Sequence, residues 1–444
     1  MRRTGRAVLI ATLAVGLFGA GGLGLIRVGS SPDQATAPPT QADRLAASPL
    51  LPAASLGQAI TELQQRLRAV PSDWRSFASL GLAYVQQARV TADPTYYPKA
   101  EGVLTRSLDL NRDENFVGLT GLGALALARH DFAGAFKWGK EARAVNPYNG
   151  NVYGVIGDSL VELGRYAKAF RTIQRMVDLK PDLGSYARVS YARELQGDVR
   201  GAIQAMRLAL GAAGTPEDAS WLSYQLGELY WNSGRPDRAA VYYHRALQFD
   251  ATFLPPRAGL AKAAWARGDV ARAIAGYRWV VARYPLPEYV IALGDIYTLA
   301  GRPHAAASQH DLLRAEERLY RSNGVNVDLE LALFDADHGR PKAGLTAARA
   351  EWRRRHSVQV ADALAWALYR NGRSEAAVPY VRRALSLGMR NALFFFHAGM
   401  IDLALGRADE GRANLQRALA INPHFSIQHA STAMQTLRRL EGAP

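Results

Sequence analysis

One short pattern, which recurs about every 34 residues, constrains what this chain can fold into. The pattern is a glycine followed by Arg or Asp, with a small residue a few positions later. Successive glycines are separated by 33, 37, 34, 33, 38, 33 and 34 residues. A unit of this size buries its apolar face only against neighbouring units, so the period predicts a stack of similar units. The glycines are Gly164, Gly197, Gly234, Gly268, Gly301, Gly339, Gly372 and Gly406.

Within each period, the residue pattern predicts two helices joined by a tight turn. Leu226 and Tyr230 are four positions apart, so they lie on one face of the first helix and pack against the second. The glycine at the turn can adopt the left-handed conformation that ends a helix. A small residue in the second helix leaves room for the next unit. These small residues are Ala100, Ala135, Ala169, Ala202, Ala239, Ala273, Ala306, Gly344, Ala377 and Gly411.

These features resemble the tetratricopeptide repeat (TPR), a helix pair that carries Leu, Gly, Tyr and Ala at fixed positions. The resemblance extends over about ten repeats, 73–423, between capping helices at 55–70 and 425–440. It implies an all-α fold, a right-handed α-α superhelical TPR solenoid at 55–440. It also implies a non-enzymatic scaffold whose concave groove binds a peptide or a protein segment. The copy that matches best has Ser223, Leu226, Gly227, Tyr230, Ala239, Tyr243 and Ala246.

The N-terminus has the pattern of a membrane anchor. Arg2, Arg3 and Arg6 precede a run without charged residues, 7–26. Twenty helical residues span about 30 Å, the thickness of the hydrocarbon core of a bilayer. The excess of Arg before the run favours an N-terminus inside the cell. We therefore expect 1–26 to be a signal anchor, the transmembrane helix of a single-pass protein whose TPR domain lies outside the cytoplasmic membrane.

Two features of the same region leave alternatives open. The run is rich in glycine, which lowers its hydrophobicity and keeps a cleaved signal peptide, and hence a secreted protein, as the alternative. Gly16, Ala20 and Gly24 have the spacing that lets two helices approach closely, which predicts weak self-association. Residues 27–54 contain five prolines among Ser, Thr, Ala and Gln, so we expect a Pro-rich linker there.

The net charge of +15 favours contact with anionic surfaces. It supports a second hypothesis, a secreted or membrane-surface structural protein that binds anionic polymers through a basic outer surface. The Arg residues are scattered, which favours ordinary solvated helix faces instead. The densest cluster, Arg353, Arg354 and Arg355, falls late in a second helix, where we expect a solvated outer face. Nucleic acid is not an expected partner.

The sequence does not contain the motifs of catalysis, cofactor binding or metal binding that we sought. It has no cysteine, which excludes thiolate nucleophiles and Cys-type zinc sites. His304 and His310 are six positions apart, which does not fit the i, i+4 spacing of a helical zinc site. Gly134 to Lys140 imitates a P-loop, but Glu141 replaces the Ser or Thr that binds magnesium. We expect no enzymatic activity, no catalytic residue, no cofactor and no metal.

The concave groove should be lined by side chains one or two positions away from the packing positions of the first helices. These side chains are aromatic and acidic, in contrast with the basic chain as a whole. Large aromatic side chains dominate many binding hot spots, and carboxylates suit a basic peptide or helix. The alternative is that Trp231 and Trp265 pack as core between repeats. The predicted partner-binding residues are Asp158, Tyr191, Glu194, Tyr224, Glu228, Trp231, Asn232, Lys262, Trp265, Asp295, Trp366 and Tyr369.

Three insertions interrupt the period, at 90–97, 211–216 and 321–326. Insertions in repeat arrays map to loops at the edge of the stack, where they can shape a partner site. The alternative is that they are tolerated surface loops.

The predicted orientation can be tested with a C-terminal fusion to alkaline phosphatase, which is active only outside the cytoplasm. We expect an active fusion, because Arg2, Arg3 and Arg6 retain the N-terminus inside the cell. Enzyme activity is measured in intact cells and divided by the amount of fusion protein on an immunoblot. A fusion that is well expressed and inactive would contradict the external location.

Overall fold

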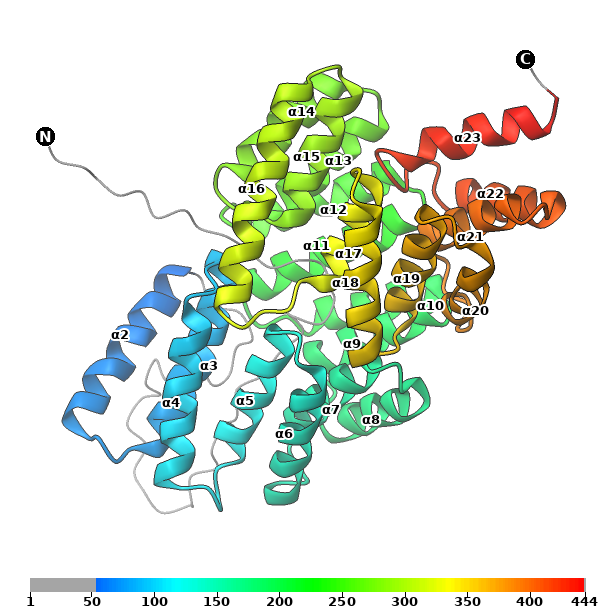
Figure 1. Ribbon diagram of the computed structural model, residues 1–444. Coiled ribbons are helices and arrows are strands. Elements are labelled where there is room, and N and C mark those ends of the chain that lie inside the picture. Colours follow the sequence, from blue (N-terminus) through cyan, green and yellow to red (C-terminus); the bar gives the residue numbers. More distant parts are fainter. Residues whose placement is uncertain (1–52, 443–444) are drawn as a thin grey trace, which may run out of the picture.

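The computed structural model describes residues 53–442, which fold into helices joined by short loops (Figure 1). The all-α prediction is confirmed for this part of the chain, which has 22 helices and no strand. The predicted anchor, 1–26, and most of the predicted linker, 27–54, lie outside the described residues. Within 53–442, no helix is both long enough and apolar enough to cross a membrane.

The helices between the first and the last form ten antiparallel pairs. Each odd-numbered helix from α3 to α21 is the first helix of a pair, and the next even-numbered helix is the second. The unpaired end helices are α2 (Ala53–Ala69) and α23 (His429–Leu440). The pairs are α3 (Trp74–Thr91) with α4 (Tyr96–Leu110), α5 (Phe116–Ala128) with α6 (Phe132–Val145), α7 (Gly150–Glu162) with α8 (Tyr166–Leu179), α9 (Leu183–Leu195) with α10 (Val199–Gly211), α11 (Pro216–Asn232) with α12 (Pro236–Phe249), α13 (Pro255–Ala266) with α14 (Val270–Val281), α15 (Pro287–Leu299) with α16 (Pro303–Ser322), α17 (Asp328–Asp337) with α18 (Pro341–Arg354), α19 (Val358–Arg370) with α20 (Ser374–Ala384), and α21 (Ala392–Ala404) with α22 (Ala408–Ile421).

The first helices form the inner layer of the superhelix, and the second helices form the outer layer. Many successive first helices contact one another, as α3 does with α5 and α17 does with α19, whereas the second helices contact the first helix of their own pair and, for most of them, the helix that follows. Because the concave side of a curved stack is the shorter side, helices of successive pairs meet there. The burial of side chains agrees with this two-layer arrangement. The inner helix α19 is buried along most of its length, whereas the outer helix α10 buries mainly the face with Ala202 and Met206.

Small residues let the two helices of a pair approach closely, as the sequence pattern predicts. In the fifth pair, Ala239 and Tyr243 of α12 are fully buried. A Cβ on Gly227 of α11 would lie 2.4 Å from the Tyr243 ring, so glycine fits there without displacing the ring. Leu226 beside it is also fully buried, and burial of such a side chain contributes about 1.5–3 kcal/mol to stability.

The glycine after each first helix from α7 to α21 adopts the left-handed conformation, with φ between +68° and +81°. An L side chain is strained at such a φ, whereas glycine is not. Where an Asp follows the glycine, the carboxylate of that Asp caps the second helix. The Asp198 side chain, for example, accepts a hydrogen bond from the Gly201 backbone N–H at 2.8 Å. The turn glycine therefore ends one helix and directs the chain into the next.

The superhelix turns back onto itself, so that its second turn stacks on its first. In each of the first five pairs, the short link between the two helices contacts a loop of the second superhelical turn. That loop follows the helix pair that stands five pairs later in the chain. The constant offset indicates that repeat geometry, rather than any single loop, brings the two turns together. The five contacts join 89–92 to 284–286, 129–131 to 323–327, 162–166 to 355–358, 196–197 to 388–390, and 231–234 to 421–422.

Backbone atoms of the two turns approach each other directly in several of these contacts. A Cβ on Gly164 would lie 2.2 Å from the carbonyl oxygen of His356, and a Cβ on Gly197 would lie 2.3 Å from that of Gly388. A Cβ on Gly268, in contrast, would meet nothing within 4 Å. Turn glycines that are equivalent in sequence therefore differ in what a side chain would disturb.

Two of the three predicted insertions take part in this stacking. The insertion at 321–326 carries Asn326, whose carbonyl oxygen lies 2.7 Å from His130 Nδ1. The insertion at 90–97 places Ala92 in an apolar cluster with residues of α13, α14 and α15. Both insertions therefore extend a loop far enough to reach the other turn of the superhelix.

Arg355 lies in the third stacked contact, and its position corrects the expectation of a solvated cluster at 353–355. The Arg355 side chain is 1% exposed and forms ion pairs with Glu162 of the first turn and with Glu351 of its own helix. Its guanidinium also lies 4.5 Å from the centre of the Phe132 ring. The expectation was wrong for this residue because α18 ends at the preceding residue, where the chain leaves the outer layer. The other two arginines of the cluster are exposed.

We predict that Gly197→Ala destabilises the protein more than Gly268→Ala. Both changes place a side chain at positive φ, which costs about 1 kcal/mol. At Gly197 the new Cβ also lies 2.3 Å from a backbone carbonyl oxygen of the second turn, and we expect this overlap to cost about 1–3 kcal/mol more. Urea unfolding followed by circular dichroism measures both variants, and equal shifts of the midpoint would contradict direct stacking of the turns.

Candidate functional site

The predicted partner-binding residues lie along the inner layer, and half of them are buried. Asn232 is exposed, whereas Trp231 is packed as core. The inner face is therefore not an open groove along its whole length. The half-buried members are Tyr224, Glu228, Lys262, Trp265 and Tyr369. The buried members are Asp158, Tyr191, Glu194, Trp231, Asp295 and Trp366.

Charged members of this set form ion pairs along the inner face. Arg188 donates to the two carboxylate oxygens of Asp158 at 2.8 and 2.7 Å. Burial raises the pKa of Asp158, and the charge of Arg188 opposes this rise. Lys262 donates to Glu228 at 2.8 Å, and its ammonium lies 4.7 Å from the centre of the Trp231 ring. A partner that used these carboxylates would compete with the internal cations.

The second turn of the superhelix covers part of the inner face of the first. Gln359 of α19 donates a hydrogen bond to the hydroxyl of Tyr191 at 2.7 Å. Nearby, Asn232 donates to Glu194 at 3.1 Å, and burial raises the pKa of Glu194 to about 7. These predicted residues thus stabilise the arrangement of the repeats.

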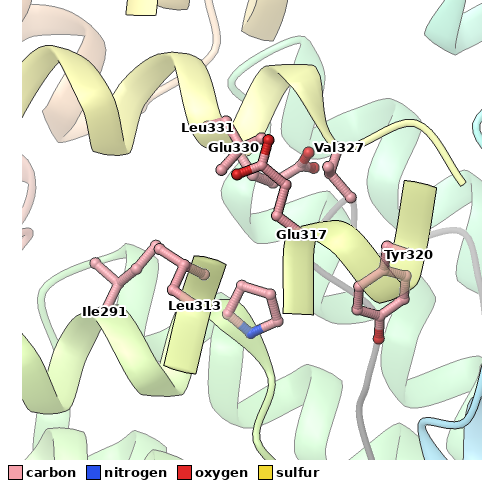
Figure 2. A pocket seen from close by; sticks show the side chains of 8 residues that line it. Ile291, Leu313, Glu317, Tyr320, Val327, Glu330 and Leu331 are labelled. Carbon is pink, nitrogen blue, oxygen red and sulfur yellow. The ribbon is translucent and has the colours of Figure 1, made fainter. Parts of the chain in front are cut away.

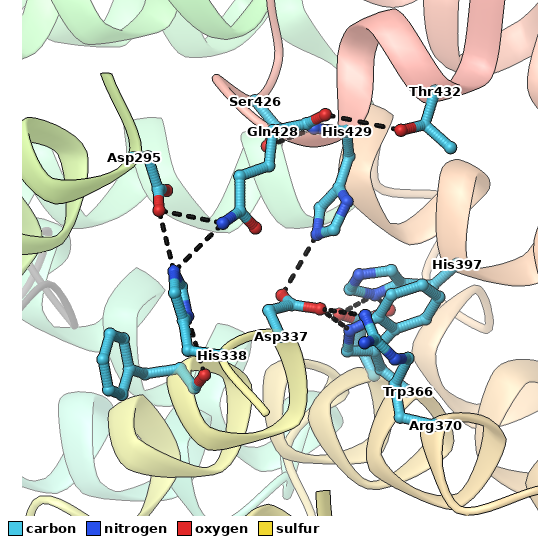
Figure 3. A network of polar contacts seen from close by, with 12 residues as sticks. Asp295, Asp337, His338, Trp366, Arg370, His397, Ser426, Gln428, His429 and Thr432 are labelled. Carbon is cyan, nitrogen blue, oxygen red and sulfur yellow. Dashed lines mark hydrogen bonds and ion pairs between the residues drawn. The ribbon is translucent and has the colours of Figure 1, made fainter. Parts of the chain in front are cut away.

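Residues 424–429, which we call the strap, contact the inner face of the last four pairs, and Figure 3 shows Ser426, Gln428 and His429 among them. The strap joins the end of α22 to the start of α23, and all its residues are half-buried. Asn422, just before it, is buried and donates to the backbone carbonyl of Trp231 at 2.9 Å. Side chains of the strap then contact α15, α17, α19 and α21. The strap is therefore a short run of turns whose side chains contact the first helices of four repeats.

Asp295 of α15 accepts two hydrogen bonds where the strap crosses it (Figure 3). Gln428 Nε2 lies 2.9 Å from Asp295 Oδ1, and His338 Nε2 lies 2.8 Å from the same oxygen. His338 Nδ1 lies 2.8 Å from the carbonyl oxygen of Phe334. His338 Nε2 also lies 3.0 Å from Gln428 Nε2, which is a donor, so the ring donates from Nδ1 in either protonation state and donates to Asp295 as well when it is protonated. Burial lowers the pKa of His338, but the hydrogen bond and charge of Asp295 outweigh burial and hold this pKa above its ordinary value.

Asp337 of α17 is the second acceptor under the strap. Its Oδ2 lies 3.0 Å from His429 Nε2. Its Oδ1 accepts hydrogen bonds from Trp366 Nε1 at 2.9 Å and from Arg370 Nη1 at 2.8 Å. Burial raises the pKa of Asp337, but the hydrogen bond and charge of His429 outweigh burial and hold it below its ordinary value. The His429 ring also stacks on Phe396, with 4.9 Å between ring centres.

Sequence reasoning found two residues under the strap, Asp295 and Trp366, and missed Asp337 and the strap itself. Asp337 stands two positions before a turn glycine, as Asn232 does, so the same offset applied to the eighth pair would have predicted it. The strap gave no such signal, because 424–429 follow the last repeat and have no counterpart in the other repeats.

A cavity between α15, α16 and α17 has room for one water molecule (Figure 2). Its volume is about 10 Å³, the space that one water needs. Burial raises the pKa of Glu330 in its wall to about 7. Over the described range, no cluster of His, Asp and Glu has an arrangement that could hold a metal ion. The lining residues are Pro287, Ile291, Leu313, Glu317, Tyr320, Val327, Glu330 and Leu331.

We predict that His338→Ala destabilises the protein more at pH 5.5 than at pH 8.5. A histidine whose pKa is raised by folding contributes stability that is fully present below its unfolded pKa of about 6.5 and is lost as pH rises through its folded pKa. Urea midpoints at the two pH values measure the effect. His244→Ala, at an exposed position of α12, is the matched control. It should change the urea midpoint only slightly, and by the same amount at the two pH values. A pH-independent effect of His338→Ala would contradict a raised pKa of His338.

Several solved structures are similar to this chain. The thermophilic TPR protein TTC0263 of Thermus thermophilus is 24% identical, with 38% of this chain and 91% of that chain covered and a TM-score of 0.35. The human IFIT1 dimer with m7Gppp-AAAA is 14% identical, with coverage of 74% and 76% and a TM-score of 0.48. The APC/C hetero-tetramer Cut9-Hcn1 is 14% identical, with coverage of 90% and 83% and a TM-score of 0.38.

Family models describe the repeat itself. Two models of the tetratricopeptide repeat match this chain, at residues 222–253, 259–316 and 363–424. No curated protein matches the sequence. The matched segments are thus similar to tetratricopeptide repeats, and the helix pairs outside them have the same helix–turn–helix arrangement.

Proposed function

We propose that this chain is a non-catalytic scaffold that binds a segment of another protein along the inner face of its repeats. Tetratricopeptide repeats generally mediate interactions between proteins. The observation that carries the proposal is the strap, a short segment of turns that is held by side chains of the first helices α15, α17, α19 and α21. A face that holds one segment of chain offers acceptors and apolar surface to another.

The partner segment should carry Lys, Arg or other N–H donors. Carboxylates of the inner layer already accept from cations of the chain itself, as Glu228 does from Lys262. Aromatic rings of the inner layer already lie beside cations, as Trp366 does beside Arg370 at 5.6 Å. A basic side chain of a partner would find the same two interactions, a charge-assisted hydrogen bond and a ring face.

We further propose that the repeats lie on the outer face of the cytoplasmic membrane. The support is in the sequence, where Arg2, Arg3 and Arg6 precede the uncharged run at 7–26. Secretion after cleavage of this run is the alternative. Weak self-association through Gly16, Ala20 and Gly24 belongs to the same proposal.

A second candidate function is the binding of anionic polymers by the outer layer. Lys168, Arg171 and Arg175 are exposed on α8 at spacings of three and four residues, so they share one solvated face. Binding of this kind weakens steeply as salt rises, whereas binding by aromatic and buried groups does so less.

We predict that a photo-crosslinking amino acid at Trp265 captures a partner protein and that the same amino acid at Arg238 does not. Trp265 is a half-buried member of the predicted set on α13, and Arg238 is exposed on the outer helix α12. Irradiation of intact cells, followed by mass spectrometry of the crosslinked product, identifies the partner. Capture should persist when membranes are washed at about 0.5 M salt before irradiation.

The opposite pattern would contradict the scaffold proposal. Equal capture from Trp265 and Arg238 would mean that partners do not bind the inner layer in preference to the outer layer. Absence of capture from Trp265, together with steeply salt-dependent retention of the protein on an anionic polymer, would favour the second function.

A further inference from the structure

The strap is held differently from the loop that joins α18 to α19. In that loop, Arg355 and Ser357 are at most 1% exposed. The strap residues are all half-buried, and side-chain hydrogen bonds and ring contacts hold them. Segments with partly exposed polar contacts open more readily than segments with fully buried ones. The strap is thus among the more readily released parts of the inner face.

We infer that the strap is a competitor in cis: it occupies a binding site on α15, α17, α19 and α21 and is displaced by a segment of a partner protein. This inference rests on the proposed scaffold function, and it names the site and the chemistry of the segment. Asn422 remains anchored to the carbonyl of Trp231, so the strap and α23 leave together while α22 and the stacked turns stay in place.

Release of the strap leaves acceptors that require new donors. Asp295 loses Gln428 at 2.9 Å, and Asp337 loses His429 at 3.0 Å. Both carboxylate side chains are 12% exposed with the strap in place, and they keep His338 on Asp295 and Trp366 on Asp337 when it leaves. A partly buried acceptor that has lost its donor favours any segment that restores the hydrogen bond. The same site therefore retains affinity for a segment supplied by another protein.

The sequence of the strap specifies the segment that fits. Phe425 packs against Phe396 with 5.6 Å between ring centres. Gln428 and His429, three and four positions later, supply N–H groups to Asp295 and Asp337 (Figure 3). The partner segment should therefore carry an aromatic side chain followed, three and four positions later, by Gln, His, Lys or Arg.

Binding of a strap peptide to the full chain tests the inference. The probe is a fluorescein-labelled peptide with the sequence of residues 421–432, and fluorescence anisotropy measures its affinity. The double variant Gln428→Ala, His429→Ala should bind it at least about tenfold more tightly than the unaltered chain, because the competitor in cis is weakened. Adding Asp337→Asn to the double variant should weaken binding about tenfold again.

Met434→Ala is the matched control. This residue is exposed on α23 outside the strap, so the change should leave peptide affinity as in the unaltered chain. Circular dichroism melting checks that every variant folds. Equal affinity of the unaltered chain and the double variant would overturn the inference, and so would binding that is insensitive to Asp337→Asn.

A second measurement does not depend on strap variants. The chain has no cysteine, so spin labels can be placed uniquely at Met434→Cys on α23 and at Ser308→Cys on α16. The peptide should shift the distance between the labels to larger values, as the strap and α23 leave. Peptide binding without this shift would overturn the inference. If the shift occurs but Trp265 captures no partner in cells, the scaffold proposal fails and the site itself stands.

Discussion

A buried ion pair between the two turns of the superhelix constrains the rest of this structure. The guanidinium of Arg355 is enclosed between Glu162 of the first turn and Glu351 of its own helix. Removing one member of such a pair leaves an uncompensated buried charge, which costs about 3–5 kcal/mol. In an open solenoid each unit contacts only its neighbours. Here α7 is also tied to residues almost 200 positions later, so the two turns support each other.

The stacking of the turns determines which parts of the inner face a partner can reach. Gln359 of the second turn covers Tyr191, and the strap covers Asp295 and Asp337. Between these regions, Lys262 remains half-buried and is held by Glu228 rather than by the other turn. A partner therefore meets either internal ion pairs or a segment of the chain itself, and in both cases binding is a competition.

The periodic part of the structure could be predicted from the sequence, and the contacts between turns could not. The helix pairs follow from local spacing, and the positions one or two residues from the packing positions include Glu228 and Asp295, which lie on the first helices α11 and α15. Gly197 and Gly268, however, occupy the same place in the repeat, and only Gly197 faces a carbonyl oxygen of another turn. That difference depends on how tightly the superhelix coils, which is a sum of small rotations over many pairs and has no local signature. The burial of Arg355 escaped prediction for the same reason.

The strap begins where the stacking ends, and this position has a physical cause. Each turn from the first pair to the fifth receives a loop from the pair five places later, and the last such loop carries Asn422 onto Trp231. The next turn in this register, at Gly268, receives no loop, and a Cβ there would meet nothing within 4 Å. No further pair follows α22 in the described chain, so its concave side would lie open. The strap folds inward over that side instead, and its hydrogen bonds replace the contacts that another pair would have made. Because those bonds are polar and partly exposed, the end of the superhelix that lacks a neighbour is also the end where an outside segment can compete.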